Sequence, residues 1–186
     1  LQFSTYFVPS KLTAQDGMEV SLQNFEKVTI DGNVAATILG TAAADTLIGD
    51  SGADTITGRA GADTLTGGSK SDTFVFSSGD TGITLDTADT ITDFSTGTDK
   101  IDITTVGNYV EADGAGNANI AAFITDADAS LPTTSIDIYA EYNFNGEGNT
   151  LVVIDEDKSG SVDAGDTLII LTGLSTAGGL DASDFI

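Results

Sequence analysis

Three residue types that carry much of protein chemistry are absent: the 186-residue sequence has no cysteine, no histidine and no tryptophan. Without histidine and cysteine the chain cannot form a Ser-His-Asp triad, a cysteine nucleophile, or an ordinary zinc or copper site. Any metal bound here must therefore be held by oxygen atoms. The absence of cysteine fits a reducing compartment, and it equally fits a secreted protein that a metal stabilises in place of disulfides.

Basic residues are scarce, since 6 lysines and arginines face 29 aspartates and glutamates and leave a net charge of −23. Such a charge opposes compaction and disfavours nucleic acid or an anionic membrane as a partner. Divalent cations are the obvious counter-charge. Halophilic adaptation and an acidic disordered tail are the alternatives. A hydrophobic content of 40% argues against disorder, and halophily gives no reason for the nine-residue phasing described below.

Long apolar runs are also missing. None approaches the roughly 20 residues that a membrane-spanning helix needs, so we expect no membrane insertion. The first residues, LQFSTYFVPSK, lack the basic region and apolar core of a signal peptide. The sequence begins with leucine in place of an initiating methionine, which is consistent with a fragment of a longer protein.

Four consecutive nonapeptides fill residues 40–75, reading GTAAADTLI, GDSGADTIT, GRAGADTLT and GGSKSDTFV. Each has an aspartate at the sixth place (Asp45, Asp54, Asp63, Asp72) and an apolar residue at the eighth. A period this short and strict is typical of a coiled parallel β architecture. One nonapeptide reverses the chain once, so alternate copies stack about 4.8 Å apart. Carboxylates at that separation repel unless a cation lies between them, and turn carbonyls supply further oxygen ligands.

A glycine-rich flexible linker is the alternative reading of these residues. A linker, however, gives no reason to place Leu47, Ile56, Leu65 and Phe74 in phase with the aspartates. We therefore expect a calcium-binding ladder.

The pattern resembles the GGxGxDxUx repeat of the RTX proteins, a calcium-binding β-roll family exported by Gram-negative bacteria. The resemblance implies that Asp45 shares ions with the loop at residues 58–63, and Asp54 with the loop at residues 67–72. The implied ligands, carbonyl or carboxylate, are Gly40, Ala42, Asp45, Gly49, Ser51, Asp54, Gly58, Ala60, Asp63, Gly67, Ser69 and Asp72.

Several copies depart from the family pattern. The second glycine is Thr41, Asp50 and Arg59 in the first three copies, and the fourth place holds Ala43 and Lys70 in the outer two. We expect the outer loops to bind calcium more weakly.

The segment after the repeats reads DTADTITDF and then STGTDKIDI over residues 86–103. It resembles the stretch that caps the roll in serralysin-type proteases, alginate epimerases and bacterial S-layer proteins. Its apolar residues, Ile91 and Phe94 among them, are expected in the core. Asp89, Asp93 and Asp99 are either additional metal ligands or solvated turn residues, and the sequence leaves both readings open.

A β-hairpin is predicted from residues 135–144 and 149–157, which are rich in apolar and β-branched residues and flank a glycine-containing connection. Residues 120–127 are expected to form a short helix.

The second strand of that hairpin runs into DEDKSGSVDAGD, which fits the twelve-residue calcium loop of the EF-hand type. The glycine at its sixth place is Gly160, and the candidate ligands are Asp155, Asp157, Ser159, Ser161, Asp163 and Asp166. Two features depart from the pattern, because the twelfth place is aspartate in place of glutamate and strands flank the loop. An ordinary acidic turn is the alternative.

The C-terminal sequence LTGLSTAGGLDASDFI resembles the uncleaved export signals of type I secretion. That resemblance implies that Asp181, Asp184, Phe185 and Ile186 are recognised in the unfolded chain. The other reading is a final strand that packs Leu180 and Phe185 into the core, and one segment can do both.

One tripeptide, Asp80-Thr81-Gly82, is that of the aspartic proteases. Those enzymes need two facing copies whose carboxylates share a proton, and this sequence has one. We interpret it as a turn and predict no enzymatic activity for the chain.

The sequence thus predicts an all-β fold, a parallel β-roll continued by a C-terminal β-sandwich-like capping region. Residues 1–39 are expected to be closing strands of a preceding β unit, residues 40–76 the roll, and residues 77–186 the capping region with the export signal.

The predicted function is that of a calcium-folded C-terminal module of a type I secreted S-layer protein on a Gram-negative cell surface, serving export and lattice assembly. Its expected partners are several calcium ions, the secretion machinery and copies of itself. The alternative is an accessory domain of an exported protease, lipase or epimerase. A third reading, an adhesin or ice-binding repeat, would need a flat array built from Thr46, Thr55 and Thr64.

Overall fold

The computed structural model describes residues 12–13, 18–21, 27–31, 33–103, 107–112, 117–131 and 137–186. The first strands are β1 (Leu12–Thr13), β2 (Met18–Ser21), β3 (Lys27–Asp31), β4 (Ala36–Leu39), β5 (Thr46–Ile48), β6 (Thr55–Thr57) and β7 (Thr64–Thr66). They are followed by β8 (Thr73–Phe76), β9 (Asp89–Ile91), β10 (Lys100–Ile103), β11 (Asn108–Ala112), the helix α1 (Ile120–Ser130), β12 (Asp137–Phe144), β13 (Asn149–Asp155), β14 (Thr167–Leu171) and a 3-10 turn (Ala182–Asp184).

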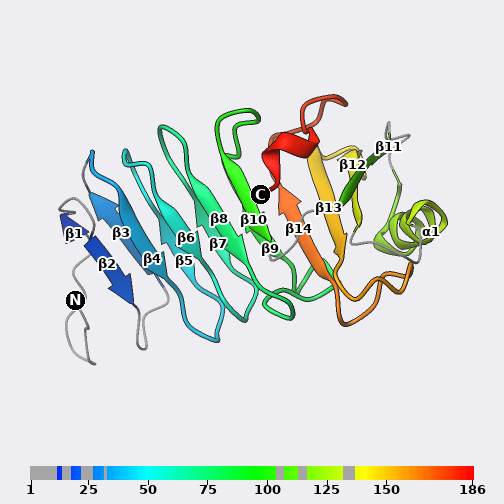
Figure 1. The fold of residues 1–186 in the computed structure, drawn as a ribbon, viewed down its shortest axis with the longest axis horizontal. Coiled ribbons are helices and arrows are strands. Elements are labelled where there is room, and N and C mark those ends of the chain that lie inside the picture. The colour runs from blue at the N-terminus through cyan, green and yellow to red at the C-terminus, as the bar shows by residue number, and fades with distance from the viewer. Residues whose placement is uncertain are drawn as a thin grey trace.

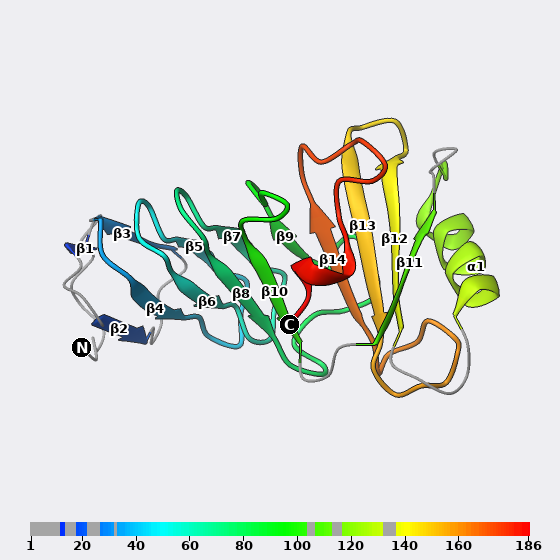
Figure 2. The same cartoon turned by 45° about the horizontal axis from the view of Figure 1, so that its top comes forward.

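The repeats form a parallel β-roll, in which successive short strands alternate between two facing sheets (Figures 1 and 2). Within a sheet, residues 18 positions apart are paired, as in Leu47 with Leu65 and Ile56 with Phe74. These four side chains point inward and are 0% exposed, because the strand period of two turns the eighth residue of each copy toward the core. The predicted all-β fold with a parallel roll is confirmed.

Threonines flank these inward residues but form no single row. Thr46 pairs with Thr64 in one sheet, whereas Thr55 pairs with Thr37 and Thr73 in the other.

The roll extends beyond the four repeats on both sides. Before them, β2 pairs with β4 and β3 pairs with β5, both in parallel. After them, β9 pairs with β7 and β10 with β8, so Ile91 and Ile101 continue the buried rows. The division of the chain at residues 39 and 76 stays a prediction. The strands β4 and β8 end at these residues, and both sheets continue beyond them.

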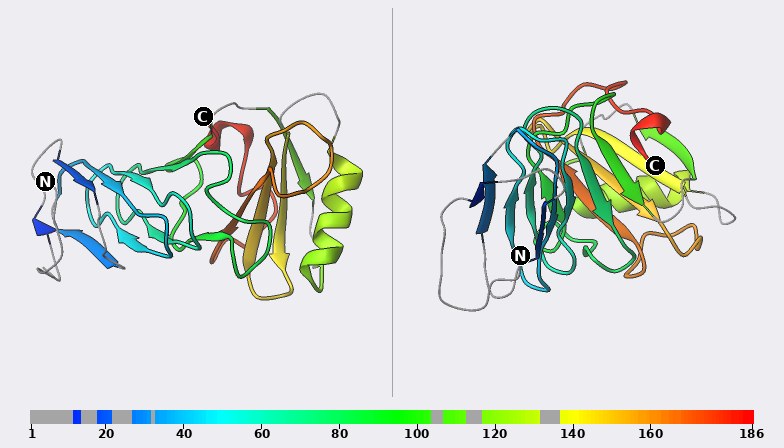
Figure 3. Two further views of the ribbon diagram at one scale, coloured as in Figure 1. Left: turned by 90° about the horizontal axis from the view of Figure 1, so that it is seen from below. Right: turned by 60° about the vertical axis from the view of Figure 1, so that its left-hand side comes forward.

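The further β region extends one sheet of the roll. Strand β14 pairs in parallel with β9, β13 and β12 follow in antiparallel order, and β11 forms the far edge, which completes a nine-stranded sheet. The predicted hairpin is confirmed, with Phe144 opposite Asn149. The predicted helix is confirmed as α1, which begins at Ile120 after the cap residue Asn119 and extends beyond the predicted residue 127 to Ser130. It lies at the end of the molecule opposite β1 (Figures 1 and 3).

Hydrophobic side chains fill both faces of this extended sheet. One cluster runs without interruption from Ile38 in the roll to Ile169 in β14 and Phe185 at the C-terminus. The other lies beneath α1 and contains Phe123 and Tyr139. Because the first cluster spans both regions, the roll and the C-terminal strands share one core.

The C-terminal residues pack against the roll. Leu180 and Phe185 are buried, the N–H of Ile186 donates to the carbonyl of Ile101 at 3.0 Å, and the N–H of Ile103 donates back to Ile186 at 3.0 Å. The expected burial of Leu180 and Phe185 is confirmed, but in place of a final strand the tail has a 3-10 turn at Ala182–Asp184 and an isolated bridge from Phe185 to Ile101. The tail covers the edge of β10 (Figure 3). Among the described residues, no helix is both long and apolar enough to cross a bilayer.

Candidate metal centre

The aspartates of the repeats stack in two columns, one on each side of the roll. In the first column, Oδ1 of Asp63 accepts the backbone N–H of Asp45 at 2.8 Å, and Oδ1 of Asp89 accepts the N–H of Asp63 at 2.8 Å. Each carboxylate is therefore fixed by the loop stacked before it. Asp89 continues the column beyond the last repeat.

The second column has the same construction. Oδ1 of Asp54 accepts the N–H of Ala36 at 2.8 Å, Oδ1 of Asp72 that of Asp54 at 2.8 Å, and Oδ1 of Asp99 that of Asp72 at 3.0 Å. The column begins without a carboxylate, since alanine stands where the period of 18 would place one.

The other carboxylate oxygen decides whether these columns fit a cation. In five of the aspartates one oxygen is buried and has no hydrogen-bond partner: Asp45 Oδ1, Asp54 Oδ2, Asp63 Oδ2, Asp72 Oδ2 and Asp89 Oδ2. The five residues are between 0 and 3% exposed. An ionised oxygen in such a place is costly unless it is paired or coordinates a metal. The donor set therefore fits calcium, which prefers oxygen ligands.

A backbone carbonyl lies beside the unpartnered oxygen of Asp54, where the first residue of the copy is glycine. A Cβ on Gly49 would lie 2.4 Å from Oδ2 of Asp54 and 2.6 Å from the carbonyl oxygen of Gly67. On Gly40 it would lie 2.3 Å from the carbonyl oxygen of Gly58. Carboxylate and carbonyl oxygens of alternate copies thus converge where a side chain would otherwise be.

The same Gly40 position lies 3.0 Å from Oδ2 of Asp45. The structure therefore brings together the two sets for which the sequence predicted shared ions, Asp45 with the loop at residues 58–63 and Asp54 with the loop at residues 67–72. The other predicted carbonyl donors lie in the connecting loops, with Ala42 and Ser69 exposed and Ser51 and Ala60 partly exposed. Their role as ligands stays a prediction.

Burial raises the pKa of the column aspartates Asp54, Asp63, Asp72, Asp89 and Asp99. It raises the pKa of Asp63 and of Asp72 to about 6 and that of Asp89 to about 8. The negative charge of Asp80 raises the pKa of both Asp63 and Asp89 further. Without a cation, Asp89 therefore holds a proton at neutral pH, and metal binding there would release it.

The three aspartates predicted beyond the repeats differ in their contacts. Asp89 carries an unpartnered buried oxygen. In Asp99 both oxygens accept hydrogen bonds, because Oδ2 takes the N–H of Ser95 at 2.8 Å. Asp93 accepts the N–H groups of Gly67 at 3.0 Å and Gly68 at 2.8 Å. The contacts give Asp93 and Asp99 a structural role at the end of the second column, and their role as ligands stays a prediction.

Sequence reasoning missed that the nine-residue period itself continues. Residues 84–92 read TLDTADTIT and residues 94–102 read FSTGTDKID, each with aspartate at the sixth place and isoleucine at the eighth. Eight extra residues, 76–83, separate the fourth repeat copy from the first of these two copies, and Asp93 separates the two copies from each other. These insertions interrupt the nine-residue phase. The sequence signal that could have revealed these copies is the Asp-x-Ile spacing, which becomes visible when insertions between copies are allowed.

The residues that depart from the glycine pattern make contacts of their own. The N–H and hydroxyl of Thr41 donate to Oδ2 of Asp45 at 2.6 and 2.9 Å. Arg59 adopts a left-handed φ of 71°, a region that favours glycine, and its guanidinium donates to the carbonyl of Gly40 at 3.1 Å. Thr41 and Arg59 thus donate hydrogen bonds to oxygen atoms of Asp45 and Gly40, two of the predicted ligand residues in the first copy.

The acidic loop between β13 and β14 forms a second cluster. Carboxylate oxygens of Asp155, Asp157 and Asp166 all lie within 4.8 Å of one another. Asp155 and Asp166 are 0% exposed while Asp157 is exposed, and burial raises the pKa of Asp166 to about 6. Places one, three and twelve of the predicted loop therefore converge, although strands in place of helices carry them.

Local hydrogen bonds shape the rest of this loop. The N–H of Gly160 donates to Oδ2 of Asp155 at 2.9 Å, and Gly160 has a φ of 71° that permits the sharp turn. The hydroxyl of Ser159 donates to the carbonyl of Ser161 at 2.9 Å, and Asp163 accepts the N–H of Gly165 at 2.9 Å. Calcium binding by this loop stays a prediction.

A comparison with protein families places a known motif on this geometry. Residues 39–74 match the RTX calcium-binding nonapeptide repeat in four copies. This match supports an RTX domain over residues 39–74. RTX repeats bind Ca²⁺ and are typical of type I secreted proteins, and the match falls on the copies that build the two columns. No curated protein matches the chain.

Proposed function

We propose that this chain is a calcium-folded module of a type I secreted protein and that calcium completes its fold after export. The observation that carries the proposal is the set of five buried carboxylate oxygens without a hydrogen-bond partner. A folded roll without cations must either leave these oxygens uncompensated or protonate them, and both alternatives weaken it at neutral pH. Folding and metal binding therefore form one equilibrium.

The ladder ions would lie between stacked loops, held by the column aspartates and by carbonyls of the repeat glycines. A separate ion would lie among Asp155, Asp157 and Asp166. Extracellular calcium modules have Kd values of about 10⁻⁴ to 10⁻³ M. At about ten times Kd each site adds about 1.4 kcal/mol to the free energy of unfolding. Inside a cell, where calcium lies far below Kd, the same sites add almost nothing.

The C-terminal tail supports the export part of the proposal. Asp184 and Phe185, which the resemblance makes part of the export signal, are buried against the roll. Oδ1 of Asp184 accepts the N–H of Gly97 at 2.8 Å, next to the loop that carries Asp99. A tail read by the secretion machinery must be unfolded, so low calcium inside the cell would keep it accessible.

Circular dichroism and thermal melting test the calcium requirement. We expect the chelated protein at neutral pH to lose most of its β signal and to regain it when millimolar calcium is added. An equal concentration of magnesium is the control, because Mg²⁺ demands smaller octahedral geometry and gives up its water reluctantly. A chelated sample that keeps its full β signal and its melting temperature would overturn the proposal.

We further propose that the module contributes to a cell-surface lattice of the S-layer kind. Electron microscopy of the calcium-loaded chain, or of the longer protein that contains it, tests this role. Ordered two-dimensional arrays would support the lattice. A monodisperse particle under the same conditions would favour the accessory domain of an exported enzyme.

A further inference from the structure

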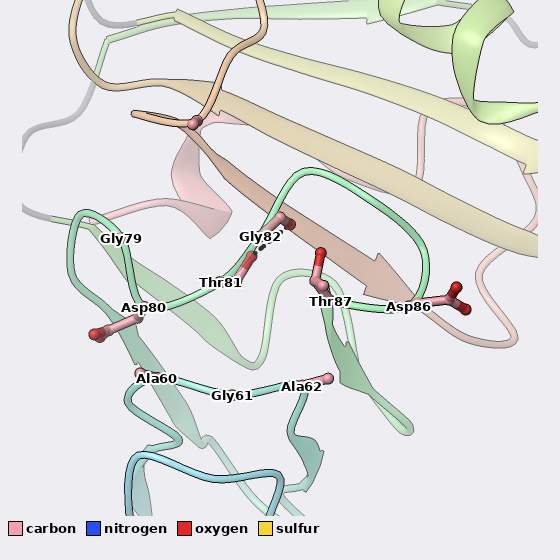
Figure 4. Close-up of a pocket in the computed structure, with 10 residues that line it drawn as sticks. Ala60, Gly61, Ala62, Gly79, Asp80, Thr81, Gly82, Asp86 and Thr87 are labelled. Carbon is pink, nitrogen blue, oxygen red and sulfur yellow. Dashed lines mark hydrogen bonds between the residues drawn. The ribbon is translucent and has the colours of Figure 1, made fainter.

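The tripeptide Asp80-Thr81-Gly82 lies in the long loop at residues 77–88, which joins β8 to β9 in the roll. Figure 4 shows this loop facing residues 60–62 of the third repeat copy. The space between them is an open pocket of about 470 Å³, and Ala164 of the acidic loop also lines it. The long loop therefore lines a pocket that borders both candidate calcium regions.

Thr81 anchors the long loop to β14. Its side chain is buried at 4% exposure, its hydroxyl donates to the carbonyl of Leu168 at 2.7 Å, and it accepts the N–H of Leu168 at 3.2 Å. A second contact joins the hydroxyl of Ser78 to the carbonyl of Gly165 at 3.4 Å. Leu168 lies two residues after Asp166, so both contacts fall at the end of the acidic loop.

At its other end the long loop connects to the first aspartate column. The loop leads directly into Asp89, whose Oδ1 holds the N–H of Asp63. Asp89 also pairs along the strand with Ile169 of β14. Asp89, the last residue of the first column, is therefore bound both to Asp63 in the column and to β14, the strand that follows the acidic loop.

We propose that the long loop couples calcium binding at the acidic loop to calcium binding at the end of the first column, with Thr81 as the positioning residue. The proposal rests on the proposed function. An ion at the acidic loop fixes Asp166 and the start of β14, and Thr81 transmits that order to the loop that presents Asp89. Coupling of this kind is reciprocal, so ladder occupancy also tightens the acidic loop.

Calcium titrations followed by amide NMR test the coupling, with the amide of Gly160 reporting on the acidic loop and that of Asp63 on the ladder. Asp157→Asn weakens the acidic loop at an exposed position. We expect it to raise the calcium midpoint of the Asp63 amide about fivefold or more. In a Thr81→Val background the same change should shift that midpoint less than about twofold.

Two matched variants distinguish the effect of the Thr81 hydroxyl from a general loss of stability. Thr81→Ser keeps the hydroxyl and should retain the coupling, and Thr90→Val removes a partly exposed hydroxyl on β9 and should not alter it. An Asp157→Asn shift of equal size with and without the Thr81 hydroxyl would overturn the proposal.

Two further outcomes are decisive. If Thr81→Val does not fold at saturating calcium, Asp157→Asn alone decides, since an unmoved Asp63 midpoint excludes coupling. If both amides titrate independently, the coupling fails while the calcium function stands. If neither responds to calcium, the proposed function itself fails.

Discussion

Asp89 and Asp99 hold the same place in the nine-residue period, but their surroundings differ. Asp89 is 0% exposed and one of its oxygens has no partner, whereas backbone N–H groups occupy both oxygens of Asp99. Whether a buried aspartate needs a cation therefore depends on how many hydrogen bonds its own carboxylate oxygens accept.

We predict that Asp89→Asn removes a calcium site. The amide cannot supply the negative charge that a cation needs, so the calcium-dependent gain in stability should fall by about 1.4 kcal/mol at calcium near ten times Kd. Asp99→Asn is the matched control and should change that gain much less. The measurement is thermal melting of each variant with calcium and with chelator. An equal loss of the gain in both variants would contradict the assignment.

The candidate ligands at this scale were predictable in part. The sixth-place aspartates and the acidic loop follow from spacing alone. The unpartnered oxygen of Asp89 does not, because it depends on which backbone N–H groups the neighbouring coil offers. The same limit applies to Thr81, since the partner that makes it a structural contact lies 87 residues away at Leu168.

At the scale of elements, the connecting loops of the roll are packed closely against one another. Alternate copies approach so closely at their first residue that a methyl group has no room. A Cβ on Gly49 would lie 2.4 Å from Oδ2 of Asp54, and the second neighbour, the carbonyl of Gly67, belongs to backbone that cannot rotate away.

We predict that Gly49→Ala separates the stacked loops and weakens calcium binding. The added methyl group should destabilise the calcium-loaded protein by about 1 to 3 kcal/mol and raise the calcium midpoint. Gly165→Ala is the control for steric destabilisation alone, because Gly165 lies in the acidic loop outside the ladder and its Cβ would meet nothing closer than 3.4 Å. Urea unfolding at fixed calcium, together with calcium titration, measures both effects. If the two variants lose equal stability, steric contact in the ladder is not the cause.

The elements themselves followed unevenly from sequence. The short strands, the hairpin at Phe144 and Asn149 and the helix α1 were predicted because each has a local pattern. The pairing of β14 with β9 was not, since it joins segments about 80 residues apart and depends on which sheet edge remains open when the roll ends.

For the whole molecule, the net charge of −23 sets the balance between folding and repulsion. Burial gives several carboxyls in the folded state pKa values far above the ordinary value of 3.8, at about 6 for Asp63, Asp72 and Asp166 and about 8 for Asp89. The folded chain without calcium therefore binds more protons than the unfolded chain between these limits.

We predict that the stability of the calcium-free protein falls with rising pH and that the gain in stability from calcium rises. Without it, the stability that these groups contribute is fully present below about pH 4 and is lost as pH rises through about 6 to 8. The gain from calcium should increase over the same range, because the ions replace protons. Melting temperatures at about pH 5 and about pH 8.5, with calcium or chelator, check both signs. A chelated protein that is more stable at the higher pH would contradict the prediction.

The sequence by itself determined the coiled parallel strands, the inward row of apolar residues, the choice of oxygen ligands and the two acidic motifs. It could do so because each rests on short spacing, and spacing acts through the local periods of strands and turns. Only the tertiary structure decided that the first column ends at Asp89, that the C-terminal strands extend the sheet of the roll, and that Thr81 is hydrogen-bonded to the backbone of Leu168 in β14. Those outcomes depend on contacts between distant segments, which exist only once the shared core has brought them together.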